Sequence, residues 1–189
     1  MRVKLTTRIG SAKLDLQIDI GFGDVVTPPA SVITFPTLLD AAPVRLRAYS
    51  RESVVAEKVE AMVHLGIANS RMKDFYDVWI ISRRFGFDGP PLCEALRATF
   101  KRRETTLPDK PPAALTEGFS SDQNKLRQWQ AFLKKSKAEA QDLGQVVEAL
   151  RLFLMPPAQA AAQGETFEQS WLAGGPWIPS PRTKVEGSQ

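Results

Sequence analysis

The sequence predicts an α+β fold in which strands come first and helices follow. Three segments within the first 50 residues alternate apolar and polar side chains, a pattern typical of half-exposed strands. From Ser50 onward, apolar residues instead recur every three or four positions, as they do along one face of a helix. The order of these two periodicities places a helical region in the C-terminal half of the chain.

The first two alternating segments predict a β-hairpin. Polar and apolar residues alternate over 2–9, with Val3, Leu5 and Ile9 on one side, and again over 13–20, and Gly10-Ser11 supplies a turn between them. Prolines in the stretch 28–36 favour an extended or looped conformation. Residues 44–49 alternate once more and predict a third strand.

Five helices are predicted after these strands. Ser50 is a favourable N-cap for the first, which should end near Gly66, and the others span about 72–84, 90–103, 121–135 and 138–154. After Pro156-Pro157 the composition shifts to Ala, Gln, Gly, Ser and Pro, so we predict a flexible tail in which Trp171 and Trp177 can still dock. The predicted organisation is a sheet region over 1–49, a helical domain over 50–155 and a flexible tail over 156–189.

The composition excludes several classes of protein. No apolar run reaches the ~20 residues that a membrane-spanning helix needs. The basic N-terminus is not followed by an apolar segment, so it is not a signal peptide. The single cysteine, Cys93, cannot form an internal disulfide and is expected in the core. These features predict a cytoplasmic protein without membrane contact.

A mild positive charge leaves nucleic-acid binding open. The formal net charge is +4, and the basic residues gather in Lys101-Arg102-Arg103 and in Lys134-Lys135-Ser136-Lys137. Such clusters attract phosphate backbones. They are equally typical of solvated helix ends, where cations complement the helix dipole.

Asp19 is the first candidate functional residue. It lies between isoleucines at the end of the second predicted strand, followed by Gly21-Phe22-Gly23. Aspartate is depleted in strands, and at a strand end its carboxylate can bind a metal such as Mg²⁺. The alternative is a solvent-facing residue on a half-exposed sheet.

Lys58 is the second candidate, because it lies on the apolar side of its predicted helix. Its neighbours one turn away include Val54 and Met62, whereas Glu57, Glu60 and His64 occupy the polar side. A lysine in this position needs an anionic partner, such as a triphosphate, or extends its tip into water. Both interpretations stay open, and His64 is interpreted as a surface residue.

The third candidate is the segment Arg71 to Trp79. Asp74 and Asp77 are three residues apart and therefore share one helix face, with Arg71 and Lys73 at the start of the same helix. Asp74 can also simply complement the helix dipole in the first turn. Asp77 lies deeper in the helix and is harder to explain in that way.

The order of these motifs resembles the AbiEii/AbiGii nucleotidyltransferase toxin family. The resemblance is carried by Asp19-Ile-Gly-Phe-Gly-Asp24, Pro36-Thr-Leu-Leu39, Tyr49 through Ala56-Glu-Lys58 to Met62, and Asn69-Ser-Arg-Met-Lys-Asp-Phe-Tyr-Asp-Val-Trp79. These proteins are toxin components of bacterial toxin–antitoxin and phage-abortive-infection systems. The resemblance implies a DNA polymerase β-like nucleotidyltransferase core, here a partial antiparallel or mixed sheet, followed by a C-terminal helical bundle.

The resemblance also implies roles for the candidate residues. Asp19 matches a supporting strand carboxylate and metal ligand, and Lys58 matches the helix lysine that contacts nucleotide phosphates. Lys73, Asp74 and Asp77 match the Lys-Asp-x-x-Asp helix, in which the two aspartates would orient Lys58 or the base, and Arg71 would join Lys58 and Lys73 in binding the nucleotide. Implied partners are an NTP with Mg²⁺, an RNA acceptor resembling tRNA, and a cognate antitoxin protein.

One part of the family pattern is missing from this sequence. The family has an early Gly-Ser segment followed by an Asp-x-Asp strand, but Gly10-Ser11 is followed by the hairpin that carries Asp15 and Asp19. We therefore expect a truncated member of the family that does not catalyse transfer by itself. Two functions stay open: a nucleotidyltransferase toxin, and a non-catalytic remnant that binds RNA or a protein partner.

Overall fold

The four N-terminal strands form two separate antiparallel hairpins. The computed structural model describes residues 1–23, 25–37 and 41–180. β1 (Arg2–Ile9) pairs with β2 (Ala12–Asp19), and β3 (Ser31–Phe35) pairs with β4 (Val44–Ala48). The predicted first hairpin and the predicted strand over 44–49 are confirmed. β3 was not expected from the sequence, because the flanking prolines indicated only an extended or looped stretch.

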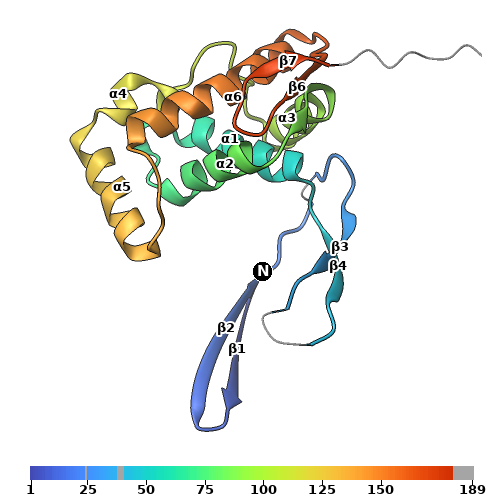
Figure 1. Cartoon of the computed structure of the whole chain (residues 1–189), viewed down its shortest axis with the longest axis vertical. Coiled ribbons are helices and arrows are strands. Elements are labelled where there is room, and N and C mark those ends of the chain that lie inside the picture. The colour runs from blue at the N-terminus through green and yellow to red at the C-terminus, as the bar shows by residue number, and fades with distance from the viewer. Residues whose placement is uncertain (24, 38–40, 181–189) are drawn as a thin grey trace, which may run out of the picture.

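The two hairpins extend from the helical part of the molecule (Figure 1). Each is a two-stranded sheet of its own, so the strands of the predicted sheet region do not join into one layer. Their side chains are largely exposed, including apolar ones such as Leu16 at 50% and Phe35 at 55%. The α+β class is confirmed, with the core lying among the helices and not against the hairpins.

The five predicted helices are confirmed, four with small changes at their ends and the last with a later start and a much later end. They are α1 (Arg51–Leu65), α2 (Met72–Arg84), α3 (Gly89–Arg103), α5 (Gln123–Ser136) and α6 (Leu143–Gln163). The Ser50 hydroxyl accepts a hydrogen bond from the Ser53 N–H at 3.1 Å, which caps α1 as predicted. Gly66 ends α1 at a positive φ of 50°, a conformation that glycine adopts without a side-chain clash. Three short elements complete this region: η1 (Gly66–Ala68), η2 (Ala113–Leu115) and α4 (Glu117–Ser120).

The helices enclose one hydrophobic core. α1 packs against α3, and α6 packs against both α2 and α3. The Phe75 ring of α2 stacks on Phe119 of α4 with ring centroids 5.2 Å apart. Trp129 of α5 is fully buried, and its indole N–H donates to the carbonyl of Gln141 at 3.2 Å. Cys93 is buried as predicted, and His64 is exposed as predicted.

The C-terminal region differs from the predicted flexible tail. α6 continues through Pro156 and Pro157 as far as Gln163. Beyond it, β6 (Gln169–Trp171) and β7 (Trp177–Pro179) pair with each other, and β6 also pairs with β5 (Phe87–Asp88). The predicted docking of Trp171 and Trp177 is confirmed by indole hydrogen bonds to the carbonyls of Ser82 at 2.8 Å and Phe153 at 2.9 Å. Residues 181–189 of the predicted tail lie outside the described residues.

The bond from Trp177 explains how α6 accommodates Pro157. Pro157 has no N–H, so it cannot donate to the carbonyl of Phe153 four residues earlier. The Trp177 indole donates to that carbonyl instead. A local rule that ends helices before proline therefore fails here, because a distant side chain satisfies the acceptor.

Candidate functional site

Lys58 of α1 is held between two aspartates of α2. Its Nζ lies 2.6 Å from Oδ1 of Asp74 and 2.8 Å from Oδ2 of Asp77. The two carboxylates converge because a spacing of three residues places them on the same face of α2. We call Lys58, Asp74 and Asp77 the lysine clamp. Both aspartates contact Lys58 in the structure, and their predicted role, to orient Lys58 or the base, stays a prediction.

The lysine clamp is partly shielded from water. The side chains of Lys58, Asp74 and Asp77 are 20%, 17% and 21% exposed. Burial disfavours the charged ammonium, but the hydrogen bonds and charges of both aspartates outweigh it, so the pKa of Lys58 is raised above its usual value. Lys58 therefore stays protonated at neutral pH, and the simple alternative of a lysine tip extending into water is wrong.

Lys73 adds a second positive charge to the clamp. Its Nζ lies 2.6 Å from Oδ2 of Asp77, the same oxygen that contacts Lys58. The Lys73 side chain is 72% exposed, so it covers the clamp from the solvent side of α2. Two ammonium groups and two carboxylates thus balance within the cluster.

Two adjoining cavities open beside the clamp. The first, of about 200 Å³, is lined by Lys58 and Asp74 together with Val54, Glu57, Ala61, Arg71 and Arg103. The second, of about 320 Å³, lies further along α1 and is lined by Glu60, Ala61, His64, Leu65, Arg71 and Arg103. Arg71 lines both cavities, and its part in nucleotide binding stays a prediction.

Sequence analysis missed two residues of these cavities as site residues. Arg103 was predicted only as part of a basic cluster, but the last turn of α3 brings it to both cavities. Glu60 was assigned to the polar surface of α1, and that assignment is wrong. It is only 5% exposed, and its carboxylate accepts a hydrogen bond from the Thr105 hydroxyl at 2.7 Å. The periodicity of α1 could not reveal that α3 covers this side as well.

Asp19 lies on the first hairpin and is bonded within it. Its carboxylate accepts from Nε of Arg2 at 2.6 Å and from Nε2 of Gln17 at 2.9 Å. The hydrogen bond from Arg2, supported by that from Gln17, lowers the pKa of Asp19. The contacts described for Asp19 do not connect it to the lysine clamp. Asp24 and Leu39, which belong to the motifs quoted above, lie outside the described residues.

The acidic residues in the described part of the chain do not fit a protein-held Mg²⁺ site. Mg²⁺ is bound through carboxylate oxygens, and here the negative charge of Asp19 is offset by a guanidinium and the charges of Asp74 and Asp77 by ammonium groups. Among the described residues, no three His, Cys, Asp or Glu side chains gather in an arrangement suited to a metal. Metal binding by Asp19 stays a prediction.

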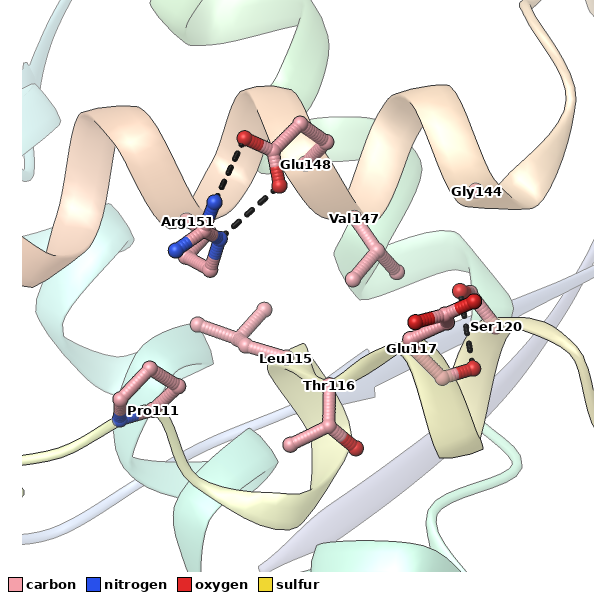
Figure 2. A pocket seen from close by; sticks show the side chains of 9 residues that line it. All are labelled: Pro111, Leu115, Thr116, Glu117, Ser120, Gly144, Val147, Glu148 and Arg151. Carbon is pink, nitrogen blue, oxygen red and sulfur yellow. Dashed lines mark hydrogen bonds and ion pairs between the residues drawn. The ribbon is translucent and has the colours of Figure 1, made fainter.

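A larger cavity elsewhere contains none of the predicted site residues. It has a volume of about 470 Å³ and lies between η2, α4 and α6 (Figure 2). At its rim Arg151 forms two hydrogen bonds to the Glu148 carboxylate, at 2.7 and 2.9 Å. Arg151 and Glu148 are therefore paired with each other, and Glu117 is a further acidic residue of the lining.

Comparisons with known proteins identify the family. The family model described as the nucleotidyl transferase AbiEii toxin of a type IV toxin–antitoxin system matches residues 1–163, which include Asp19 and the lysine clamp. No curated protein and no solved structure matches the chain. None of the described helices combines the length and hydropathy needed to cross a membrane. The chain belongs to the AbiEii family of nucleotidyltransferase toxins.

Proposed function

We propose that this toxin-family chain binds the phosphates of an NTP at Lys58 and supports transfer of a nucleotidyl group to an RNA acceptor. The observation that carries the proposal is the lysine clamp. A lysine ammonium has three N–H donors. Asp74 and Asp77 occupy two of them, which leaves the third for a ligand in the adjoining cavity. The clamp thus holds Lys58 as a fixed, charged donor.

The charges around the cavity favour a phosphate ligand. Three basic side chains, Lys58, Arg71 and Arg103, line it together with the acidic Glu57 and Asp74. Arg71 is exposed at the N-terminal end of α2. A guanidinium there can contact two phosphate oxygens at once, whereas Lys58 acts as a point charge.

In the proposed reaction, the 3′-hydroxyl oxygen of the RNA forms a bond to the α-phosphorus of the NTP. The bond from that phosphorus to the bridging oxygen breaks, pyrophosphate leaves, and the hydroxyl proton passes to solvent. Lys58 and Arg71 would hold the phosphates during this displacement. No residue described here is assigned as the general base.

The RNA acceptor is supported by the basic helix ends. Lys101 and Arg102 lie in the last turn of α3, and Lys134 and Lys135 lie in the last turn of α5. All four side chains are exposed. Because the family consists of toxins paired with antitoxins, a cognate antitoxin is a further expected partner.

A second function, binding without catalysis, is favoured by one specific observation. Asp19, Asp74 and Asp77 are each bonded to a positively charged side chain, which leaves none of them as a free carboxylate. An assay for incorporation of labelled nucleotide into RNA separates the two functions. Transfer by the chain supports the first, and NTP or RNA binding without transfer supports the second.

Calorimetric titration with each of the four NTPs, with and without Mg²⁺, tests the nucleotide site. We expect Lys58→Met to weaken binding by about 10- to 100-fold, the effect of losing a hydrogen bond to a charged group. Lys110→Met is the matched control, since it removes the same charge from an exposed position that lines neither cavity. Equal affinities for wild type and Lys58→Met would rule out Lys58 as the phosphate contact.

A further inference from the structure

Lys125 is a buried lysine that the proposed function does not use. It lies in the first turn of α5 and is only 7% exposed. Its Nζ donates to the backbone carbonyl of Asn69 at 2.9 Å and lies 5.2 Å from the ring centroid of Phe119. Burying an ammonium group is costly unless it is well paired, so this position requires an explanation. A methionine of similar length would fill the same space without that cost.

Asn69 connects Lys125 to the candidate site. It is fully buried in the turn between α1 and α2, and its Oδ1 accepts a hydrogen bond from the Arg71 N–H at 2.8 Å. One residue therefore receives the Lys125 ammonium on its carbonyl and fixes the backbone of Arg71 with its side chain. Arg71 lines both cavities, and α2 begins at the next residue.

The turn is held in a single orientation by polar groups. The carbonyl of Ser70 accepts from the Met72 N–H at 2.9 Å, and that of Arg71 accepts from the Asp74 N–H at 2.9 Å. Asn69 Nδ2 is buried without a hydrogen-bond partner, which is a further cost. A turn that only linked two helices would not need either buried group. Their combined effect is to fix where Arg71 and Asp74 stand relative to Lys58.

We infer that Lys125 is a positioning residue of the nucleotide site, acting through Asn69 on Arg71 and on the first turn of α2. This inference rests on the proposed function. The contacts described for Lys125 are with Asn69 and Phe119, which are not part of the lysine clamp; through Asn69 it holds the turn from which Arg71 and Asp74 extend. The structure thereby links α5, which ends in the basic cluster at Lys134 and Lys135, to the cavity beside Lys58.

The experiment compares two variants of Lys125 in the full chain. Lys125→Met keeps the length of the side chain but removes the donor, and Lys125→Arg restores a donor. We expect Lys125→Met to weaken NTP binding by about fivefold, the scale of a lost positioning contact, and Lys125→Arg to recover part of this loss. Urea unfolding identifies conditions in which each variant is fully folded.

A control separates positioning from stability. Cys93→Ala removes a buried thiol that donates to the Pro157 carbonyl at 3.3 Å, far along the chain from the Asn69 turn. We expect it to lower stability without changing NTP affinity. If Lys125→Met does not fold, Asn69→Ala takes its place, because it removes the acceptor for the Arg71 N–H and should weaken binding similarly. Wild-type affinity in a folded Lys125→Met, or in Asn69→Ala when that variant is used, would overturn the inference.

A second readout does not depend on nucleotide. The pKa of Lys58, measured by NMR, should fall towards its ordinary value in Lys125→Met if the turn carries Asp74 away from the clamp. If the wild-type chain binds no NTP, the proposed function fails, and this measurement decides only the part of the inference in which Lys125 positions Asp74 beside Lys58. An unchanged pKa of Lys58 would then overturn it, and a lowered one would support it.

Discussion

Replacing Lys58 by methionine should destabilise the protein far more than replacing its neighbour Lys73. Lys58→Met keeps most of the side-chain stem in place. It leaves the carboxylates of Asp74 and Asp77 side by side, with only Lys73 to balance them. Two like charges in a half-buried position repel each other and have lost their common hydrogen-bond donor.

The exposed fractions of the Lys58, Asp74 and Asp77 side chains set the expected loss of unfolding free energy in Lys58→Met. Breaking a fully buried ion pair costs about 3–5 kcal/mol, and an exposed pair contributes about 0–1 kcal/mol. The clamp side chains are 17–21% exposed, close to the buried limit, so we expect a loss of about 2–3 kcal/mol. For a chain of 189 residues this lowers Tm by about 4–12 °C. Lys73→Met breaks an exposed i,i+4 pair and should cost only about 0.3–0.5 kcal/mol.

The stability difference between wild type and Lys58→Met should depend on pH with a definite sign. Burial lowers the pKa of Lys58, but the hydrogen bonds and charges of Asp74 and Asp77 outweigh burial and raise it above 10.5. A raised pKa contributes stability that is fully present below the unfolded value and is lost as pH rises through the folded value. The difference between wild type and Lys58→Met should therefore be constant from pH 7 to about 10 and shrink above 10.5.

Urea unfolding followed by circular dichroism measures these free energies. A double-mutant cycle adds Asp74→Asn to Lys58→Met, and the second change should recover part of the loss because it removes one uncompensated charge. Equal unfolding midpoints for Lys58→Met and Lys73→Met would refute the reasoning, since the clamp would then be no stronger than a surface pair.

Three further predictions concern other parts of the chain. RNA affinity should fall steeply with added salt, and charge reversal at Lys134 and Lys135 should lower the slope of log affinity against log salt concentration by about 2. A filter-binding series over several salt concentrations measures this slope, and salt-independent binding would contradict the prediction. Trp177→Phe keeps an aromatic ring but removes the hydrogen bond to α6, so urea unfolding should show a loss of about 1–2 kcal/mol, and no loss would mean that the bond is not formed. Arg2→Met should raise the pKa of Asp19 towards 3.8, which an NMR titration measures. The wild-type pair stabilises the fold above pH 3.8 and loses this contribution as the Asp19 carboxyl protonates, whereas the variant should show no such loss. An unchanged pKa of Asp19 in the variant would exclude Arg2 as the cause of the lowered pKa.

Much of the helical region and of the lysine clamp follows from local pattern. Ser50 and Gly66 mark the ends of α1 because capping and a positive φ are properties of single residues. Lys58 stands out because its own helix surrounds it with apolar neighbours, and Asp74 and Asp77 share a face through their spacing. Only their meeting depends on the packing of α1 against α2.

Features that depend on distant contacts were not predictable. Glu60 is buried by α3 and Thr105, 45 residues away, although its position on α1 suggested a surface residue. Lys125 and Asn69 are 56 residues apart, and nothing near either residue indicates the bond between them. In the hairpins, by contrast, the local alternation of apolar and polar residues predicts the strands but does not reveal what their apolar faces contact.

The hydrogen bond from Trp177 to Phe153 also determines how the C-terminal region can open. The Phe153 carbonyl lacks the usual donor four residues later, because that residue is Pro157, and the replacement donor comes from 24 residues further along the chain. Separating β7 from α6 therefore leaves the buried Phe153 carbonyl without its hydrogen-bond donor. Unfolding the C-terminal part of α6 leaves the Trp177 indole N–H without its acceptor. Neither event is favourable alone, so the two segments should open as one cooperative unit. Amide hydrogens near Ala160 and Ala161 should then exchange with solvent at the same rate as those of β6, although a helix and a hairpin would ordinarily fray independently.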